Sequence, residues 1–269
     1  MVLRLQITLI AILLMAMNLQ AQAQEDFPYP SVPAELTTPQ KRADYVVRHY
    51  WDNIDFCDTT LIHRPGMLEQ GFVNFIDLLP RLGKLEQVGW TIFTQKAIGK
   101  NPTYDKYMKG LAERYLYTTT SPMHNDTLYC HLLEAINLLP STSEAEREQN
   151  SFLIANLNKN KVGSQATNFE YTDEKGQKRQ LYSIQSDYTL LYMYDPDCET
   201  CHEVEEQMKK EKGIAHIPIV RVNAMARKDL WKSYYFRSFP TLYLLDSKKR
   251  VVLKDTELDK IVSFLREYR

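Results

Sequence analysis

The fold of this chain is decided by residues 188–210, which read YTLLYMYDPDCETCHEVEEQMKK. The apolar and aromatic run Tyr188–Tyr194 predicts a buried strand, and the residues after Cys201 are good helix formers. Cys198 therefore lies where a strand ends and a helix begins, and unpaired N–H groups and the helix dipole there stabilise a thiolate. The pattern predicts a thiol–disulfide exchange site. Cys198 would be the exposed nucleophile, and Cys201, one turn later, the less exposed resolving thiol.

Composition allows two modest domains and gives no sign of a nucleic-acid partner. The chain has 269 residues, of which 44% are hydrophobic and 25% charged, as in ordinary globular proteins. The formal net charge is −1, and no single-sign run is long enough to form an interaction tail. We therefore expect no nucleic acid among the partners.

Residues 1–23 are predicted to be a signal peptide. Arg4 supplies a positive charge, residues 5–17 are largely apolar, and Ala21-Gln22-Ala23 is a small-x-small cleavage site. The apolar run is short for a transmembrane helix, although an uncleaved N-terminal anchor is the alternative. We expect an exported protein, periplasmic in a diderm bacterium, with no membrane contact beyond the secretion signal.

The part before residue 161 is predicted to be helical. Residues 24–37 are rich in proline and should form an extended leader. Residues 38–160 should form an all-α domain of about six short helices, of unknown function. Thr38 and Asn101, each followed by proline, are helix caps, and Ser143 opens a capping box.

Residues 161–269 are predicted to form an α/β layered domain, because short apolar strands alternate with helical segments around the dithiol. Predicted strands cover residues 166–171, 180–184, 190–194, 217–222, 241–245 and 251–253, and predicted helices follow the dithiol and cover 229–235 and 258–268.

Three separated signatures give this C-terminal half a resemblance to thioredoxin-fold domains of the TlpA/ResA type. They are the opening segment Val162-Gly163-Ser164-Gln165-Ala166, the dithiol, and the strand Phe239-Pro240-Thr241-Leu242-Tyr243-Leu244-Leu245-Asp246. The resemblance implies that Pro240 is a cis-proline lying against the dithiol, and that the backbone of Phe239 pairs with an extended substrate. The expected site-shaping residues are Phe239, Pro240, Thr241, Glu199, Thr200 and Tyr194.

The helical half also carries a resemblance. Leu116-Tyr117, Ser121-Pro122-Met123 and Phe75-Ile76-Asp77-Leu78-Leu79-Pro80 resemble an uncharacterised helical domain that precedes thioredoxin domains in secreted proteins of Bacteroidetes bacteria. This implies an architecture and a periplasmic setting, and it implies no activity.

Two departures bear on the chemistry. Tyr192 stands where the thioredoxin family often has a buried carboxylate that handles the proton of the second cysteine, and a tyrosine cannot act as a base near neutral pH. Asp195, Asp197 and Glu199 place negative charge around Cys198, which opposes thiolate formation. We therefore predict a reducing dithiol rather than a strongly oxidising one.

Other roles for the cysteines remain open. Cys57 and Cys130 could form a disulfide or be two buried free thiols. The text Cys198-x-x-Cys201-His202 also matches a c-type haem attachment signature. A structural zinc site and a static disulfide at Cys198–Cys201 are further alternatives.

The predicted function is an exported thiol–disulfide oxidoreductase that reduces or isomerises client disulfides through Cys198 and Cys201. Its expected partners are protein or peptide disulfides and an unidentified reductant or oxidant, with no cofactor and no metal. The alternative is a binding or scaffold module with little redox activity, whose helical domain mediates protein interaction.

Overall fold

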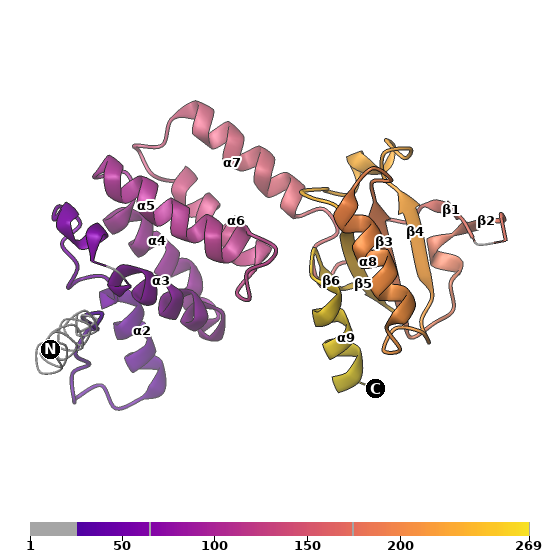
Figure 1. Ribbon diagram of the computed structural model, residues 1–269. Coiled ribbons are helices and arrows are strands. Elements are labelled where there is room, and N and C mark those ends of the chain that lie inside the picture. Colours follow the sequence, from indigo (N-terminus) through magenta and orange to yellow (C-terminus); the bar gives the residue numbers. More distant parts are fainter. Residues whose placement is uncertain (1–25, 65, 174, 269) are drawn as a thin grey trace, which may run out of the picture.

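The computed structural model describes residues 26–64, 66–173 and 175–268. The predicted signal peptide lies outside these residues. Figure 1 shows a group of helices, a separate layered sheet, and the long helix α7 running from one to the other. We call residues 26–160 the helical domain and residues 161–268 the sheet domain. This order of a helical part followed by an α/β part confirms the fold class predicted from the sequence.

The helical domain contains the six predicted helices. They are α2 (Pro39–His49), α3 (Met67–Leu78), α4 (Leu85–Ala97), α5 (Pro102–Ala112), α6 (Asp126–Asn137) and α7 (Glu144–Leu157), with the 3₁₀ turns η1 (Thr59–His63) and η2 (Leu79–Leu82) and the π-helical turn η3 (Glu113–Tyr117). The predicted caps are confirmed. Thr38 accepts a hydrogen bond from the backbone N–H of Lys41, and Asn101 accepts one from that of Thr103.

Aromatic side chains dominate the core of the helical domain. Phe75 is fully buried, and its ring centroid lies 5.3 Å from that of Trp51 and 5.6 Å from that of Trp90. Phe27, in the predicted leader, is only 4% exposed and packs on this cluster. A Cβ atom at Gly71 would overlap the ring of Phe27. One residue of the leader therefore belongs to the core, which the proline content of the segment did not indicate.

The main sheet of this domain has four strands in the order β4-β3-β5-β6, with β3 and β4 parallel and the other pairs antiparallel. A separate hairpin precedes it. The strands are β1 (Glu170–Thr172), β2 (Lys178–Gln180), β3 (Tyr188–Tyr194), β4 (Ile219–Asn223), β5 (Thr241–Asp246) and β6 (Val251–Lys254), and the helices are α8 (Glu199–Lys210) and α9 (Leu258–Glu267), with the 3₁₀ turns η4 (Leu181–Ser183) and η5 (Leu230–Lys232).

Three sequence predictions are wrong in this domain. Of the predicted strand 166–171, only the last two residues are strand, because β1 begins at Glu170. The predicted strand 180–184 is mostly the 3₁₀ turn η4, because Leu181 is buried and the Tyr182 hydroxyl donates to the carbonyl of Ala166. The predicted helix 229–235 is reduced to the single turn η5. Tyr234 instead turns into the core and its hydroxyl donates to the carbonyl of Thr167.

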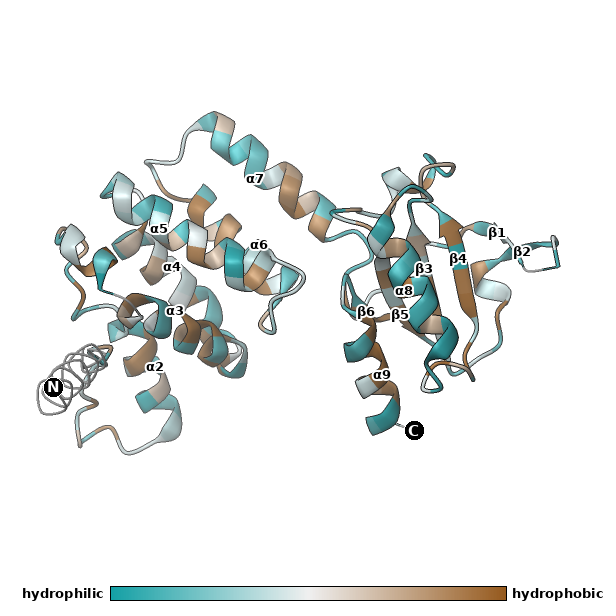
Figure 2. Ribbon diagram, in the orientation of Figure 1, coloured by the Kyte–Doolittle hydropathy of each residue, from teal (hydrophilic) through white to brown (hydrophobic). Residues whose placement is uncertain are grey.

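The sheet separates two apolar clusters. Alternation along β3 places Leu191 and Met193 in one cluster and Leu190 and Tyr192 in the other, which contains residues of α8 and α9. Figure 2 shows hydrophobic residues in strands of the main sheet, such as β4, and hydrophilic residues along much of α8. This alternation places Tyr192 beneath the helix that carries the dithiol.

Four charged side chains join the two domains, and we call them the interdomain charge cluster: Asp126, Arg237, Lys254 and Asp255. The Arg237 side chain is only 6% exposed, and its guanidinium lies 2.9 Å from the carboxylate of Asp126 and 2.6 Å from that of Asp255. The Lys254 ammonium lies 3.6 Å from Asp126 and donates to the carbonyl of Leu157 at 2.7 Å. Buried charges are stabilised only when they are paired, and this cluster pairs Asp126 of the helical domain with Arg237 and Lys254 of the sheet domain.

Among the residues that the structure describes, no helix combines the length and apolar composition that crossing a membrane requires.

Candidate active site

The two thiols of the dithiol differ in exposure. Cys198 is the N-cap residue of α8 and is half-buried, and its Sγ accepts the backbone N–H of Cys201 at 3.3 Å. Cys201 is 1% exposed. Burial, together with the hydrogen bond to Cys198, raises the pKa of the Cys201 thiol to about 12. The structure records both as free thiols, so one is accessible for attack and the other is held protonated behind it.

The loop before β5 lies against Cys198. The Phe239–Pro240 peptide bond is cis, as predicted. The Cys198 Sγ lies 3.6 Å from the carbonyl oxygen of Phe239, in position to donate its proton. Thr241 is buried, and its hydroxyl donates to the carbonyl of Ser238 at 2.7 Å. These contacts bring together three residues predicted to shape the site and one of its thiols.

Tyr192 and Tyr194 form the floor next to the dithiol. Their rings stack with centroids 5.3 Å apart, and the Tyr192 hydroxyl donates to the backbone carbonyl of Cys201 at 2.7 Å. Burial raises the pKa of the Tyr192 hydroxyl, so it stays protonated and acts as a donor rather than a base. Tyr194, predicted to shape the site, contributes mainly through this stack.

The acidic residues around the dithiol lie at the surface. Asp197 and Glu199 are exposed, whereas Asp195 is half-buried and its carboxylate accepts the backbone N–H of Asp197 at 2.9 Å. Asp195 acts on the buried thiol in two opposite ways, because its backbone hydrogen bond lowers the pKa of Cys201 whereas its negative charge raises it, and burial and the bond to Cys198 are the larger causes of the raised value. The predicted effect of the acidic residues on Cys198 stays a prediction.

A groove with a volume of about 330 Å³ begins at the cis-proline and is lined by both domains. The helical domain contributes Thr119 and Thr120, and the sheet domain contributes residues that include Thr200, Phe239 and Pro240. Thr200, the last of the predicted site-shaping residues, is exposed and lies on the wall formed by α8. The groove thus extends the dithiol site toward the helical domain.

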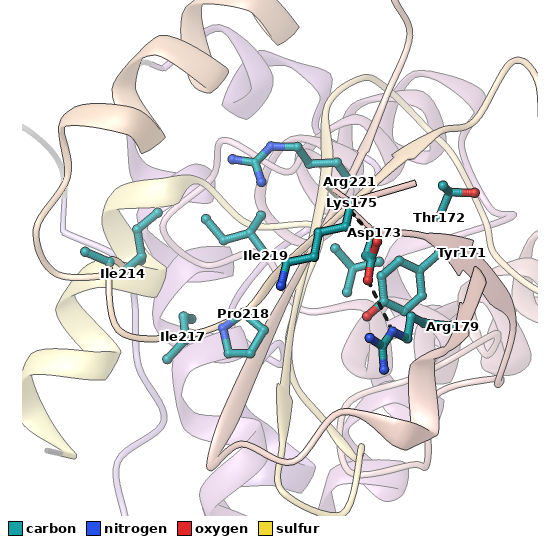
Figure 3. A pocket seen from close by; sticks show the side chains of 12 residues that line it. Tyr171, Thr172, Asp173, Lys175, Arg179, Ile214, Ile217, Pro218, Ile219 and Arg221 are labelled. Carbon is teal, nitrogen blue, oxygen red and sulfur yellow. Dashed lines mark hydrogen bonds and ion pairs between the residues drawn. The ribbon is translucent and has the colours of Figure 1, made fainter. Parts of the chain in front are cut away.

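A larger cavity of about 460 Å³ lies elsewhere, between the β1–β2 hairpin and the edge strand β4 (Figure 3). Its lining includes Tyr171 and Ile219, and an ion pair of 3.1 Å joins Asp173 to Arg179 within it. No lining residue belongs to the dithiol or the cis-proline loop. Cavity size therefore does not identify the reactive site here, and the thiol chemistry does.

The two remaining cysteines lie outside the site. Both are free; Cys130 is buried as predicted, but Cys57 is exposed, which corrects the expectation of two buried thiols. The reason is local: the neighbouring Phe56 takes the core position, and the backbone N–H of Cys57 donates outward to the carboxylate of Asp55.

The residues do not fit a c-type haem. Attachment requires both thiols of the motif to reach the porphyrin, and Cys201 is enclosed in the core. The histidine of the motif is also engaged, because a ring nitrogen of His202 lies 2.9 Å from the carbonyl oxygen of Pro196. Within the described part of the chain, no three histidine, cysteine or acidic side chains are grouped so that they could hold a metal ion.

Sequence reasoning missed the residues that tie the site to the helical domain. Arg237 stands two positions before the cis-proline loop, and its partner Asp126 is 111 residues away in the chain. Sequence reasoning also missed the aromatic rings beside this loop. Trp231 is 42% exposed and its ring lies 5.1 Å from Phe236, which stacks 5.6 Å from Phe239. The one sequence signal for the contact between the domains was an arginine, Arg237, two residues before the Phe-Pro motif.

Comparison with solved structures supports the fold. A thioredoxin-like protein from Bacteroides caccae is 28% identical, with a TM-score of 0.71 over 91% of this chain and 99% of the other. Two further structures match about 40% of the chain. The C-terminal domain of an uncharacterized Bacteroides fragilis protein is 29% identical, with 99% of it covered and a TM-score of 0.35. A thiol:disulfide interchange protein from Bacteroides sp. is 20% identical, with 89% covered and a TM-score of 0.32.

The first of these likenesses extends over both domains, so the sheet domain has a thioredoxin-like fold preceded by a helical domain. No curated protein matches the chain. A family described as a domain of unknown function, DUF5106, matches residues 13–160, which is more than half of the sequence. The chain therefore belongs to the DUF5106 family, with a thioredoxin-like domain after the family's characteristic region.

Proposed function

We propose that this protein is an exported thiol–disulfide oxidoreductase that reduces or isomerises disulfides in protein or peptide clients. The observation that carries the proposal is the position of the accessible Cys198 sulfur, 3.6 Å from the carbonyl before cis-Pro240, with a buried second thiol one turn behind it. The thioredoxin-like fold supports the same chemistry.

In the first step, the Cys198 thiolate attacks one sulfur of a client disulfide. The client S–S bond breaks, a Cys198–client S–S bond forms, and the other client sulfur leaves as a thiolate that takes a proton from solvent. Cys198 is the N-cap residue of α8 and the more exposed of the two thiols, so it is the sulfur that a client disulfide can reach. The backbone next to Phe239 would hold the extended client segment.

In the second step, Cys201 loses its proton to solvent and its thiolate attacks the Cys198 sulfur. The mixed disulfide breaks, the second client thiolate leaves, and a Cys198–Cys201 disulfide remains. The client has gained two electrons, and a partner dithiol must return two electrons to the protein. Burial of Cys201 persists in the mixed disulfide and keeps the pKa of its thiol above the usual value. This step is therefore slow near neutral pH, which gives a client thiol time to attack the mixed disulfide and isomerise the client.

Insulin reduction with dithiothreitol as the electron source tests the proposal. We expect the wild-type protein to accelerate the turbidity and Cys198→Ser to abolish the acceleration. Cys57→Ser is the matched control, because it removes an exposed thiol far from the site. A wild-type protein without activity would support the alternative of a binding module, and the same loss in Cys57→Ser would contradict the assigned site.

The proposed setting is the periplasm, and the proposed poise is reducing. The predicted signal peptide supports the periplasmic setting, and a mature N-terminus at residue 24 in the exported fraction would test it.

The acidic residues Asp195, Asp197 and Glu199 support a reducing poise, because negative charge disfavours the thiolate that a strong oxidant must stabilise. Equilibration with glutathione measures the potential, and a value near about −120 mV, typical of a disulfide-forming oxidase, would contradict a reducing poise.

A further inference from the structure

We propose that the helical domain forms one wall of the client-binding groove, and that this groove accepts a client segment with lysine or arginine beside its reacting cysteine. The inference rests on the proposed function, since it assigns a substrate class to the same site. It follows from how one loop of the helical domain is held, where the groove lies, and which charges line it.

The loop 118–120 of the helical domain is fixed at both ends by the sheet domain. Before it, the carbonyl of Tyr117 accepts a hydrogen bond of 3.0 Å from Arg237, whose guanidinium also lies 4.8 Å from the centre of the Tyr117 ring. After it, the carbonyl of Ser121 accepts a hydrogen bond of 3.3 Å from Lys260 in α9. The loop is therefore positioned by contacts that belong to the sheet domain.

The π-helical turn η3 delivers Tyr117 to this interface. The backbone N–H of Thr118 bonds to the carbonyl of Glu113, which closes the wide turn. The Tyr117 hydroxyl then lies 3.2 Å from that of Tyr235 in the sheet domain. Such turns are rare and are frequent at functional sites, and this one aims the end of α5 at the loop next to the cis-proline.

The groove joins this loop to the reactive site. Thr119 and Thr120 line the same 330 Å³ space as Phe239 and Pro240, and the carbonyl of Phe239 contacts the Cys198 sulfur. A client whose backbone pairs with the cis-proline loop would therefore extend into a space with the helical domain on one side.

The titratable side chains that line the groove are all acidic: Glu203, Asp255, Glu257 and Asp259. Asp255 is neutralised by Arg237, but the other three are exposed and have no ion-pair partner among the described residues. Lys260 lies nearby, and its ammonium bonds to the carbonyl of Ser121. A client cation would meet uncompensated negative charge, which raises association rates and selects against acidic segments.

Two disulfide peptides with the same sequence, except for two lysines or two glutamates beside the cysteine, test the inference. With wild-type protein at low salt, we expect kcat/KM to favour the lysine peptide by roughly tenfold or more. The preference should fall toward one in the double variant Glu203→Gln/Glu257→Gln. The control Glu134→Gln/Glu148→Gln removes two exposed charges on α6 and α7 and should keep the preference. Equal reaction of both peptides with the wild type would overturn the inference.

The helical wall has its own test. Thr120→Lys places a cation on the wall contributed by the helical domain, and Thr120 is exposed, so the fold should tolerate it. The preference for the lysine peptide should fall severalfold, whereas Thr103→Lys, an exposed threonine of α5, should leave it unchanged. An unchanged preference in Thr120→Lys would show that the helical domain does not line the bound client.

Failure of the proposed function can be told apart from failure of this inference. Hydroxyethyl disulfide is uncharged and reports the exchange chemistry, so its reduction alongside equal reaction of the two peptides would reject only the groove. Fluorescence anisotropy of the two peptides, labelled and with serine in place of cysteine, measures binding without any exchange. Tighter binding of the lysine peptide would support the groove even in a protein that reduces nothing, and equal binding would overturn it.

Discussion

The two domains bury their apolar side chains in different ways. The helical domain has one continuous core in which aromatic rings such as Trp51, Phe75 and Trp90 pack on one another, and no predicted reactive residue lies in it. The sheet domain divides its core between two clusters on opposite faces of the sheet, and the dithiol lies at the end of the strand between them. The difference indicates that the helical domain supplies stability and a wall, whereas the sheet domain supplies the geometry of exchange.

The largest expected effect is a loss of stability of the helical domain when its aromatic core is truncated. Phe75→Ala removes a fully buried ring that contacts both tryptophans, and such truncations cost about 3–5 kcal/mol. We expect the helical domain to unfold at lower urea than the sheet domain, which the fluorescence of Trp51 and Trp90 would report. Reduction of hydroxyethyl disulfide should persist beyond that transition.

Leu244→Ala is the matched control in the sheet domain, because Leu244 is also fully buried, on the central antiparallel pair β3–β5. It should lower stability and activity together. If Phe75→Ala also abolished reduction of the small disulfide at the start of its transition, the division between a stabilising domain and a reactive domain would be wrong.

The next largest effect is a loss of stability when the interdomain charge cluster is weakened. Asp126→Asn removes one negative charge from the interdomain charge cluster and should cost roughly 1–3 kcal/mol, because Arg237 and Lys254 lose a buried partner. We expect the single urea transition to split into two. Asp44→Asn is the control, since Asp44 forms only an exposed ion pair with Arg48 and should cost little.

Ionisation of Asp126 also makes the free energy of unfolding depend on pH. Burial opposes ionisation of Asp126, but the His124 hydrogen bond and the charges of Arg237 and Lys254 outweigh it and hold the pKa below its usual value. The stability contributed by ionised Asp126 is therefore present above the unfolded pKa of about 3.9 and is lost as pH falls through the lower folded value. Acid unfolding should be less steep in Asp126→Asn, and an unchanged slope would contradict this role.

Local signals explain what the sequence could predict. Thr38 and Asn101 cap helices because each has an oxygen acceptor next to proline, whereas the cis bond at Phe239-Pro240 was predicted from the resemblance to the thioredoxin fold. Cys198 could likewise be placed at a helix start from neighbouring residues. Such local signals placed the six helices of the helical domain, whereas the predicted strand 180–184 and the predicted helix 229–235 failed where side chains turn into the core.

Contacts between distant residues explain what the sequence could not predict. Phe27 packs on Tyr50 and Gly71 through the shape of the folded core, and Asp126 meets Arg237 only when two domains dock. The groove lined by both domains depends on the same docking. Neither periodicity nor a motif records such pairs, so the position of the dithiol between a strand and a helix was predictable and the groove lined by both domains was not.

The third effect is on the rate of the second exchange step. A mixed disulfide of Cys198 with thionitrobenzoate should release its chromophore faster as the pH rises from 7 to 9, because burial persists in this state and keeps the pKa of the Cys201 thiol above its usual value. Stopped-flow absorbance measures the release. Cys201→Ser should remove it, and a rate that levels off below pH 9 would show that Cys201 ionises more easily than its burial implies.

The smallest effect separates two tyrosines of the sheet domain. The Tyr192 hydroxyl donates to the carbonyl of Cys201 at 2.7 Å, whereas the buried Tyr243 hydroxyl has no hydrogen-bond partner within the described part of the chain. Tyr192→Phe should therefore cost about 1 kcal/mol, and Tyr243→Phe, the matched control, should be neutral or stabilising, because it removes an unsatisfied buried polar group.

Urea titration of the reduced proteins measures both changes, and single-turnover release from the mixed disulfide reports the position of Cys201. If the Tyr192 hydroxyl holds the first turn of α8 in place, Tyr192→Phe should alter the release rate and Tyr243→Phe should not, although both rings stay in the core. Equal costs and equal rates would mean that the bond to Cys201 adds nothing to the packing of the ring. The dithiol would then be positioned by the strand and the helix start alone, which are the two features that residues 188–210 encode.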